Sequence, residues 1–471
     1  MARFHVTITA RDEDAVADLV RKHKVTVARH CIEELAKGYR VDAHATGAEI
    51  KALEKAGYKV KRREDVDREG RKRQTEHKRA VRERLSLERV SQAGAPRPGP
   101  KRGDGTRAIA KAAAGYLSVD EVEAALAAAA GPQNSGFTEL IQLPNKTWEG
   151  RACSLLRIGK GAAGDRPGIY LLGGVHAREW GSPDILLHFV NQLAGAYSSG
   201  VAIKIGTKTF SAAKLKGVVE GKDIYVFPQA NPDGRLHSMT KDPMWRKNRR
   251  PSPGKPSCIG VDINRNYDFL WDYPKYFSTT APIANSTACQ DETFIGPSAF
   301  SEPETKNAAW AFGEFPGIRY FIDVHSYSED ILYSWGDDDL QTSDPSMNFG
   351  NAAFNGKRGD PNDSTYREYM PVVDRTAMVK LATGMQNAIK SVRGRVYKVE
   401  QAVGLYPTAG TSDDYAFSRH FVDGAKPKVH SFTIEWGSQN NPTPFHPPYP
   451  EMQKIIQEIT AALFEFCIRA A

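Results

Sequence analysis

The sequence predicts two folded units: a large α/β domain whose sheet is flanked by helices, and before it a small α+β domain. Strand-like apolar segments alternate with helical patterns through the C-terminal part, and shorter patterns of both kinds fill the first 65 residues. A basic segment rich in Pro and Gly separates the two parts. At 471 residues, 40% hydrophobic and 25% charged, the chain can bury a substantial core. We therefore divide it at 1–65, 66–110 and 111–471.

The first unit combines strand and helix patterns of similar length. Its expected strands are 4–10, 25–29, 39–45 and 58–62, and its expected helices are 12–23 and 47–56. A domain of about 65 residues is only marginally stable alone. We therefore expect residues 1–65 to dock on the domain that follows.

The connector carries the chain's whole charge surplus. Residues 61–107 contain 16 Lys and Arg against 8 Asp and Glu, which equals the +8 of the full chain, so the remainder is neutral. Residues 68–90 have the composition of a solvated helix, and 92–106 that of a linker. We do not expect nucleic-acid binding, because no aromatic residues are interleaved with the charges and no nucleic-acid module is recognised. Proteases that cut after Lys or Arg should reach this connector.

The large unit begins with a capping box, Ser118 to Glu121, that opens a helix to about residue 130. Strand candidates follow at 152–157, 169–175, 223–228, 318–325, 330–335, 396–402 and 428–435. Helical patterns intervene at 183–197, 303–313, 372–391 and 450–468. This order is typical of a sheet covered by helices on both faces.

A candidate metal site follows the strand at 169–172. Gly173 and Gly174 let the backbone leave the sheet, and Ser182-Pro183 begins the next helix, so His176 and Glu179 lie on a tight connection. An imidazole and a carboxylate three residues apart can bind one divalent ion and leave places for a third ligand and a water. By itself, His-x-x-Glu is also common among ordinary surface and core residues.

Two further strand ends carry polar groups. The strand at 320–324 leads to His325, and the strand at 429–434 leads to Glu435. Ligands gather at the carboxyl ends of strands in α/β sheets. A carboxylate after an apolar run is costly to bury unless it is paired or has a function, so Glu435 is either a salt-bridged edge residue or part of the site.

Two segments, 244–250 and 260–266, place arginines near loops and beside an amide. A guanidinium binds a carboxylate through two hydrogen bonds, and Asn adds a neutral donor. This combination suits the free carboxyl end of a peptide.

Together these motifs resemble the zinc metallocarboxypeptidases of the carboxypeptidase A/B family. The matching stretches, in family order over about residues 115–471, are GGVHAREW at 173–180, NPDG at 231–234, WRKNRR at 245–250, GVDINRNYDF at 260–269, GPSAFSEPET at 296–305, DVHSYS at 323–328, LYPTAGTSDDYA at 405–416 and SFTIEWG at 431–437. The resemblance implies a mixed central sheet, a ferredoxin-like first domain, and hydrolysis of the last peptide bond of peptides or proteins.

The resemblance also implies a role for each matching residue. One zinc ion would be held by His176, Glu179 and His325, with Asp262 orienting a ligand histidine; Glu435 would be the general base and Arg246 the oxyanion donor; Asn264, Arg265 and Tyr406 would hold the substrate carboxylate, and Arg178 would be a secondary substrate-binding arginine.

Asp413 matches the position at the base of the side-chain pocket, where a carboxylate accompanies preference for Lys or Arg. Relatives with a similar SDD sequence also accept apolar residues. We therefore expect a basic, or a basic and apolar, preference and no preference for acidic residues.

Two alternatives use the same carboxylate-binding residues: a catalytically silent peptide-binding module, and an enzyme that trims cell-wall peptides. Residues 1–65 resemble a carboxypeptidase pro-segment in their element order, which implies a cover over the site until the connector is cut. Cys258 and Cys289 flank the Asn-Arg loop as a bridged pair does in secreted relatives.

No apolar run has membrane-spanning length, so we expect no membrane insertion. The start MARFHVTITARDED lacks the order of a secretory signal. The sequence as given therefore predicts a cytoplasmic protein, or a secreted one if a leader has been removed.

Overall fold

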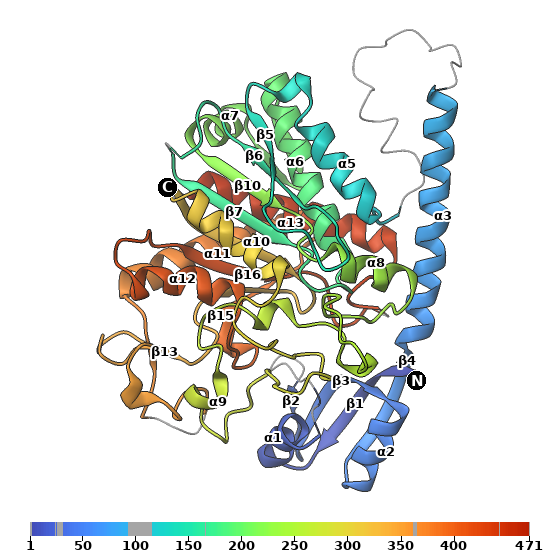
Figure 1. Ribbon diagram of the computed structural model, residues 1–471, viewed down its shortest axis with the longest axis vertical. Helices are drawn as coiled ribbons and strands as arrows, with labels where there is room; N and C mark the ends of the chain where they lie inside the picture. The colour runs from blue at the N-terminus through green and yellow to red at the C-terminus, as the bar shows by residue number, and fades with distance from the viewer. Residues whose placement is uncertain are drawn as a thin grey trace.

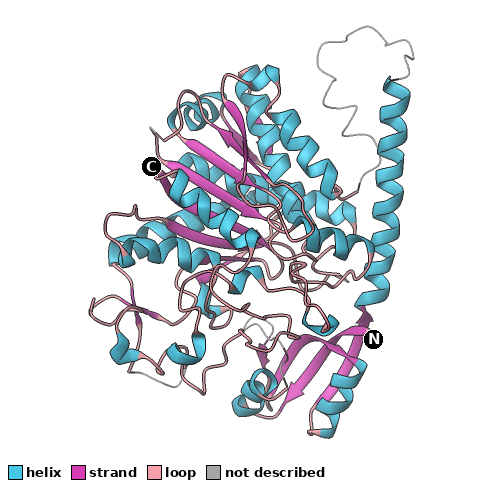
Figure 2. Cartoon of the chain, in the orientation of Figure 1, coloured by secondary structure: helices cyan, strands magenta, loops and turns pink. Residues whose placement is uncertain are grey.

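The computed structural model describes residues 2–23, 25, 32–92, 115–164, 166–360, 365–441 and 443–470. A small N-terminal unit lies at one end of the molecule, a long helix runs along one side, and a large α/β unit forms the rest (Figure 1). Figure 2 shows that the strands of the large unit lie side by side with helices on either side of them. The expected fold class is therefore confirmed.

The N-terminal unit is a four-stranded antiparallel sheet with two helices. The sheet has the order β2-β3-β1-β4. Its strands are β1 (Arg3–Ala10), β2 (Ile32–Glu34), β3 (Tyr39–Thr46) and β4 (Lys59–Asp65), and its helices are α1 (Glu13–Arg21) and α2 (Gly47–Lys55). Val6 and Ile8 of β1 lie opposite Ala43 and Val41 of β3, and their side chains form one buried core. The strand expected at 25–29 lies outside the described residues except for Val25.

Helix α3 (Val66–Gln92) occupies the first part of the expected connector. Val66, Gly70, Arg73, His77 and Ala80 are buried at helical spacing, so one side of the helix packs on its surroundings. The sequence predicted a solvated helix, and only the opposite side fits that expectation. The buried stripe escaped notice because Arg73 and His77 interrupt its apolar pattern.

The large unit is built on an eight-stranded mixed sheet of order β15-β12-β16-β11-β7-β10-β6-β5. The strands are β5 (Thr138–Gln142), β6 (Ser154–Ile158), β7 (Gly168–Gly173), β10 (Asp223–Phe227), β11 (Ile318–His325), β12 (Asp330–Tyr333), β15 (Lys398–Gln401) and β16 (His430–Glu435). Strands β16, β11, β7 and β10 run parallel to one another at the centre. Short hairpin and edge pairs lie outside this sheet at β8 (Ile203–Ile205), β9 (Lys208–Phe210), β13 (Leu340–Gln341) and β14 (Glu368–Tyr369).

Helices cover both faces of this sheet (Figure 1). The α-helices of the large unit are α5 (Val119–Ala129), α6 (Gly181–Ser199), α7 (Ala212–Gly221), α8 (Pro232–Thr240), α9 (Tyr273–Tyr276), α10 (Pro303–Glu314), α11 (Val372–Arg393), α12 (Ser412–Val422) and α13 (Tyr449–Arg469). Strand β7 shows the two faces most clearly: Ile169 and Leu171 join the core under α5, α6, α11 and α13, whereas Tyr170 and Leu172 join the core under α10. Because both faces are buried, the strand is continuously apolar.

Within the described residues, every helix is too short or too polar to cross a membrane.

Candidate active site

The polar residues predicted at strand ends meet at one edge of the central sheet. Strands β7, β11 and β16 are parallel neighbours, and His325 pairs directly with Glu435 in their register. The chain leaves β7 through Gly174, whose φ is +65° and whose position leaves no room for a side chain, since a Cβ would lie 3.0 Å from the Pro228 carbonyl oxygen. This turn directs His176 and Glu179 to the same edge as His325.

His176, Glu179 and His325 form a compact, buried cluster. His176 Nδ1 lies 2.7 Å from Glu179 Oε1, and His325 Nδ1 lies 3.1 Å from both His176 Nδ1 and Glu179 Oε2. One ligand atom from each residue lies within 4.8 Å of the others. Two imidazoles and one carboxylate form a donor set that zinc prefers in catalytic sites. The three residues therefore fit a single zinc ion.

A second layer of carboxylates orients the two histidines. His176 Nε2 lies 3.2 Å from Asp262 Oδ1, and His325 Nε2 lies 2.9 Å from Asp323 Oδ2. Asp262 also accepts hydrogen bonds from Arg246 Nε at 3.0 Å and Nη2 at 2.9 Å. Such partners fix the ring orientation and leave Nδ1 of each histidine for a metal.

The cluster's electrostatics follow from these contacts. Burial alone would raise the pKa of Glu179, but His176 and His325 outweigh it and the pKa is lowered. Arg246 and His176 similarly hold the pKa of Asp262 well below its usual value despite burial. Both carboxylates therefore stay ionised, as a metal ligand and its supporting group require.

Glu435 differs from these carboxylates. Burial raises the pKa of Glu435 to about 8. His325 lowers this pKa, but Glu179 and Asp330 raise it and so oppose His325. Its Oε2 accepts no hydrogen bond from any described residue. A raised pKa and a free oxygen facing a cavity are features of a side chain that exchanges protons.

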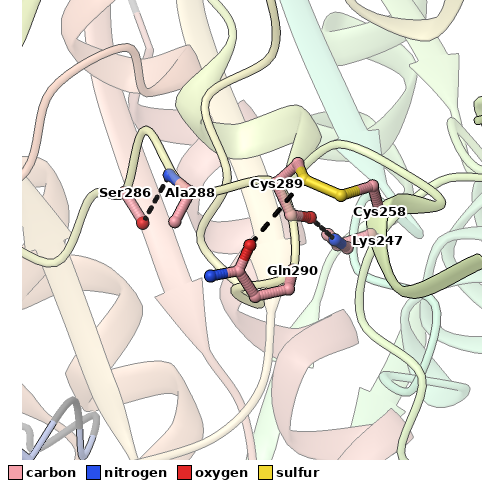
Figure 3. The surroundings of a disulfide bond; sticks show 6 residues. All are labelled: Lys247, Cys258, Ser286, Ala288, Cys289 and Gln290. Atoms are coloured by element: carbon pink, nitrogen blue, oxygen red, sulfur yellow. Dashed lines mark hydrogen bonds between the residues drawn. A yellow bond between two sulfur atoms is a disulfide. The ribbon is translucent and has the colours of Figure 1, made fainter. Parts of the chain in front are cut away.

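Two of the predicted carboxylate-binding residues, Asn264 and Arg265, lie together directly after Asp262, and the third, Tyr406, comes from a separate loop. Arg265 Nε donates to the Ala284 carbonyl oxygen at 2.7 Å, and its guanidinium lies 5.9 Å from the ring centre of Tyr406. Asn264 Oδ1 accepts a hydrogen bond from Ser412 N at 2.9 Å. A disulfide between Cys258 and Cys289 closes this segment, and Lys247 Nζ donates to the Cys289 carbonyl oxygen at 2.8 Å (Figure 3).

Asp413 lies behind strand β16, in the first turn of α12. Its Oδ2 accepts a hydrogen bond from Thr433 Oγ1 at 2.9 Å, and its Oδ1 accepts one from Asp414 N at 2.9 Å. The residue is 4% exposed. Asp413 is thus a buried carboxylate held by Thr433, which lies two residues before Glu435 on β16.

Comparison with known proteins decides what kind of site this is. A sequence profile described as zinc carboxypeptidase matches residues 124–462, which is most of the chain.

The chain belongs to the zinc carboxypeptidase family.

Its relatives include enzymes named for both main specificities. Carboxypeptidase B of Astacus astacus is 29% identical over 69% of this chain and 88% of its own length. Zinc carboxypeptidase A 1 of Drosophila melanogaster is 30% identical over 65% of this chain and 59% of its own length. Human carboxypeptidase B is 31% identical over 61% of this chain and 55% of its own length. The match thus spans little more than half of the latter two.

Solved structures agree on the fold over the whole chain. Carboxypeptidase A from Helicoverpa armigera has a TM-score of 0.71 at 20% identity, with 100% of this chain and 98% of that chain covered. Thrombin-activatable fibrinolysis inhibitor has a TM-score of 0.64 at 19% identity, with both chains fully covered.

The N-terminal unit of this zinc carboxypeptidase lies directly over the metal cluster. A cavity of about 90 Å³ is lined by Asp42, Ala43 and His44 of β3 on one side and by the site on the other. The lining residues from the site are His176, Arg178, Glu179, Arg246, Ser326, Tyr327, Leu405, Tyr406, Glu435 and Phe445. The described residues that line this cavity do not include Asn264, Arg265 or Asp413.

The cover is fixed to the carboxypeptidase unit by several contacts. The His44 ring lies 6.2 Å from Tyr327 and 5.7 Å from Phe445. Arg3 bridges Asp67 of α3 and Asp242 of the large unit. Docking of residues 1–65, which the sequence predicted, is therefore present in the structure.

Sequence reasoning missed several residues of the site. Asp323 was read as part of a strand, although a carboxylate in an apolar run was the available signal. Glu292, which accepts hydrogen bonds from Arg178 Nη1 at 3.0 and 3.2 Å, gave no signal. Phe445, whose ring lies 4.1 Å from the Arg178 guanidinium, gave none either, since it follows no recognised motif.

Proposed function

We propose that the chain is a zinc-dependent exopeptidase that hydrolyses the C-terminal peptide bond of peptides and proteins, with Glu435 as general base. The supporting observation is the direct pairing of His325 and Glu435 on adjacent parallel strands, so that Glu435 faces the same cavity as His176, Glu179 and Arg246.

One zinc ion held by His176, Glu179 and His325 would supply Lewis-acid chemistry, polarising the peptide carbonyl and lowering the pKa of water. Asp262 and Asp323 contact Nε2 of His176 and His325, so Nδ1 of each ring would be the atom available to hold the ion. The contacts of these two carboxylates with the histidines would orient the ligand side chains before zinc binds.

Glu435 takes the proton from the attacking water and then delivers it to the leaving amine. A carboxylate in water is too weak a base for this step, and burial brings its pKa closer to the working pH. The backbone of β16 holds Glu435 in place, since its neighbour on one side is His325 and on the other Asp330.

Arg246 stabilises the negative charge that develops on the carbonyl oxygen. Asp262 accepts two hydrogen bonds from its guanidinium and so fixes the plane of the group. A donor that is already oriented stabilises the transition state without reorganisation.

Asn264, Arg265 and Tyr406 hold the terminal carboxylate of the substrate. The Arg265 fork and the Asn264 amide are anchored by Ala284 and Ser412, which supports a rigid site. An internal peptide bond has no carboxylate at this point, and this limits cleavage to the last residue.

Asp413 gives the side-chain pocket a negative base and so favours Lys and Arg, with apolar residues also accepted. The hydrogen bonds from Thr433 and Asp414 fix the orientation of this carboxylate. A terminal Glu or Asp is repelled.

Residues 1–65 keep the enzyme latent until the connector is cut. His44 and Asp42 lie in the cavity that the substrate must enter, and the space left is about 90 Å³, too small for a peptide end.

The test compares the intact chain with chain cut in the connector, on peptides that differ only in a terminal Lys, Leu or Glu. The cut chain should turn over the Lys and Leu peptides, and a chelator should abolish turnover until zinc is restored. In the cut chain, Glu435→Gln should lower kcat by about 10²–10⁴ with bound peptide retained. Glu139→Gln, on the exposed edge strand β5, is the matched control.

Full activity of Glu435→Gln, or turnover without metal, would overturn the mechanism. Peptide binding without turnover by the metal-loaded wild type would instead support the silent module. Equal activity of intact and cut chains would refute latency alone.

A further inference from the structure

We propose that the outward face of helix α3 binds a linear sulfated polysaccharide. The proposal concerns a surface away from the active site and holds whether or not the chain is catalytic. It rests on how the charges of α3 are arranged around the helix.

Helix α3 has one face fixed to the large unit. A Cβ on Gly70 would meet Pro243, Gln74 Nε2 donates to the Ser238 carbonyl oxygen at 2.8 Å, and His77 Nδ1 lies 3.0 Å from the Tyr116 carbonyl oxygen. These contacts recur every three or four residues, so they define a single stripe. The rotation of the helix about its axis is therefore set.

The opposite face is a row of exposed cations. They are Arg68, Arg71, Lys72, Lys78, Arg79 and Arg82. At 100° per residue, their positions fall within an arc of roughly 120° that is opposite to the docked stripe. From Arg68 to Arg82 the row is about 21 Å long. Figure 1 shows the helix extended along one side of the molecule.

Little of this charge is neutralised by the protein. Arg68 lies 3.7 Å from Glu69, and Arg79 lies 3.8 Å from Glu83; both distances are long and both arginines are exposed, so the pairs contribute little. Arg71, Lys72, Lys78 and Arg82 have no carboxylate within 4 Å among the described residues. Glu76 is directed to Arg73 instead. Helix α3 holds 9 Lys and Arg against 5 Asp and Glu, a net charge of +4, so its field is local and positive.

The shape of the row selects among polyanions. A straight helix face without a cleft fits an extended chain that carries a charge at each repeat. The face between the cations offers Thr75 and Ser86 and no aromatic ring, so single-stranded nucleic acid would find nothing to stack on. Insertion into an anionic membrane would need an apolar face along the row, whereas the exposed large apolar side chains of α3 among the described residues are only Leu85 and Leu87, beyond the end of the row. A sulfated polysaccharide needs only the charges.

Binding has a consequence for the connector. The side chains in the row are Lys and Arg, at which trypsin-like proteases cut. A polysaccharide along α3 would cover these bonds and slow the cleavage that separates residues 1–65 from the large unit.

The experiment measures heparin affinity of the intact chain by calorimetry at two salt concentrations, with trypsin digestion as a second readout. The triple variant Arg71→Glu, Lys72→Glu, Arg79→Glu should lose at least about tenfold in affinity and most of the salt dependence. The control Lys204→Glu, Lys214→Glu, Lys216→Glu makes the same charge change on exposed positions of β8 and α7, and should stay within about twofold.

A neutral variant, Arg71→Gln, Lys72→Gln, Arg79→Gln, should show an intermediate loss and guards against misfolding of the reversed one. Equal losses in the reversed and control variants would show that net charge alone drives binding, and would overturn the proposal. Tighter binding of duplex DNA or of anionic vesicles than of heparin would overturn it as well. Slower trypsin cleavage of α3 in heparin, absent in the reversed variant, supports it.

Discussion

At the scale of single residues, the side chains of the site are oriented by hydrogen bonds and ion pairs to one another. Arg246 shows this best, because its only carboxylate partner among the described residues is Asp262, which also contacts His176. The orientation of Arg246, the proposed oxyanion donor, and that of His176 are therefore coupled through one carboxylate. A substitution at either end should disturb both.

Replacing Arg246 by Gln should lower kcat by about 10²–10³, with KM little changed, because the lost interaction forms mainly in the transition state. Steady-state kinetics on a peptide with a terminal Lys would measure both constants. Arg249→Gln is the control, since Arg249 is not among the residues that line the cavity and pairs weakly with Glu149 at 3.5 Å. A rise in KM alone would mean that Arg246 acts in substrate binding.

Asp413→Asn should change selectivity more than rate. The variant keeps acceptor capacity toward Thr433 but loses the charge, so kcat/KM for a terminal Lys should fall by at least about tenfold while that for a terminal Leu stays within about threefold. Competition between the two peptides in one reaction gives the ratio directly. An unchanged ratio would place the specificity determinant elsewhere.

At the scale of elements, the strands and helices that could be predicted from the sequence are those that are buried along their whole length. Strand β7 is continuously apolar because helices cover both of its faces, β11 is mostly apolar, and β16 alternates polar with apolar residues. The ends of these three strands pointed to His176, Glu179, His325 and Glu435. Helix α12 was missed because its first turn buries Ser412, Asp413 and Asp414, so no apolar period is visible. Helix α8 begins with Pro232, Asp233 and Gly234, which resemble a turn.

Contacts between distant segments could not be predicted in the same way. The pairing of Arg178 with Glu292, and the placement of His44 over the metal cluster, depend on loops and docking that leave no local pattern. The division of the chain at residues 65 and 110 remains a prediction. Helix α3 begins directly after the first boundary, and residues 93–110 lie outside the described residues.

The disulfide between Cys258 and Cys289 should stabilise the element that holds Asp262, Asn264 and Arg265. The two cysteines are 31 residues apart in the sequence. By loop-closure entropy, the variant Cys258→Ser, Cys289→Ser should lose about 3–4 kcal/mol of unfolding free energy. Thermal and denaturant unfolding would measure the loss, and KM should rise more than kcat falls. The buried thiols Cys153 and Cys467 stay unchanged as an internal control for cysteine chemistry. Equal stability of variant and wild type would contradict the expectation.

At the scale of the whole molecule, histidines lie along the contact between the N-terminal cover, α3 and the large unit. Burial lowers the pKa of His77 and of His446 to about 4, and that of His44 well below its usual value. Arg3 and Arg178 lower the pKa of His44 further, and Arg73 adds to the effect on His446. The docked form thus holds these rings neutral.

Docking should therefore weaken in acid. Separated histidines titrate near 6.5, and the docked form binds fewer protons, so the docking free energy is complete above about pH 6.5 and decreases as the pH falls from there toward about 4. Within that pH range, each histidine lowers the docking free energy by about 1.4 kcal/mol for every unit by which the pH falls. Burial also lowers the pKa of a fourth histidine, His5. Asp42 and Glu64 raise the pKa of His5 and so partly offset the effect of burial there.

Small-angle scattering of the intact chain should show a larger radius of gyration at pH 4.5 than at pH 7.5, and activity on a small peptide, measured after rapid return to neutral pH, should rise transiently. The double variant His44→Gln, His446→Gln keeps polar groups without titrating and should flatten the transition. His237→Gln and His420→Gln, away from the cover, serve as the matched pair and should leave it unchanged. A transition that survives intact in the first variant would assign acid sensitivity to carboxylates of the large unit and remove the histidines from the account.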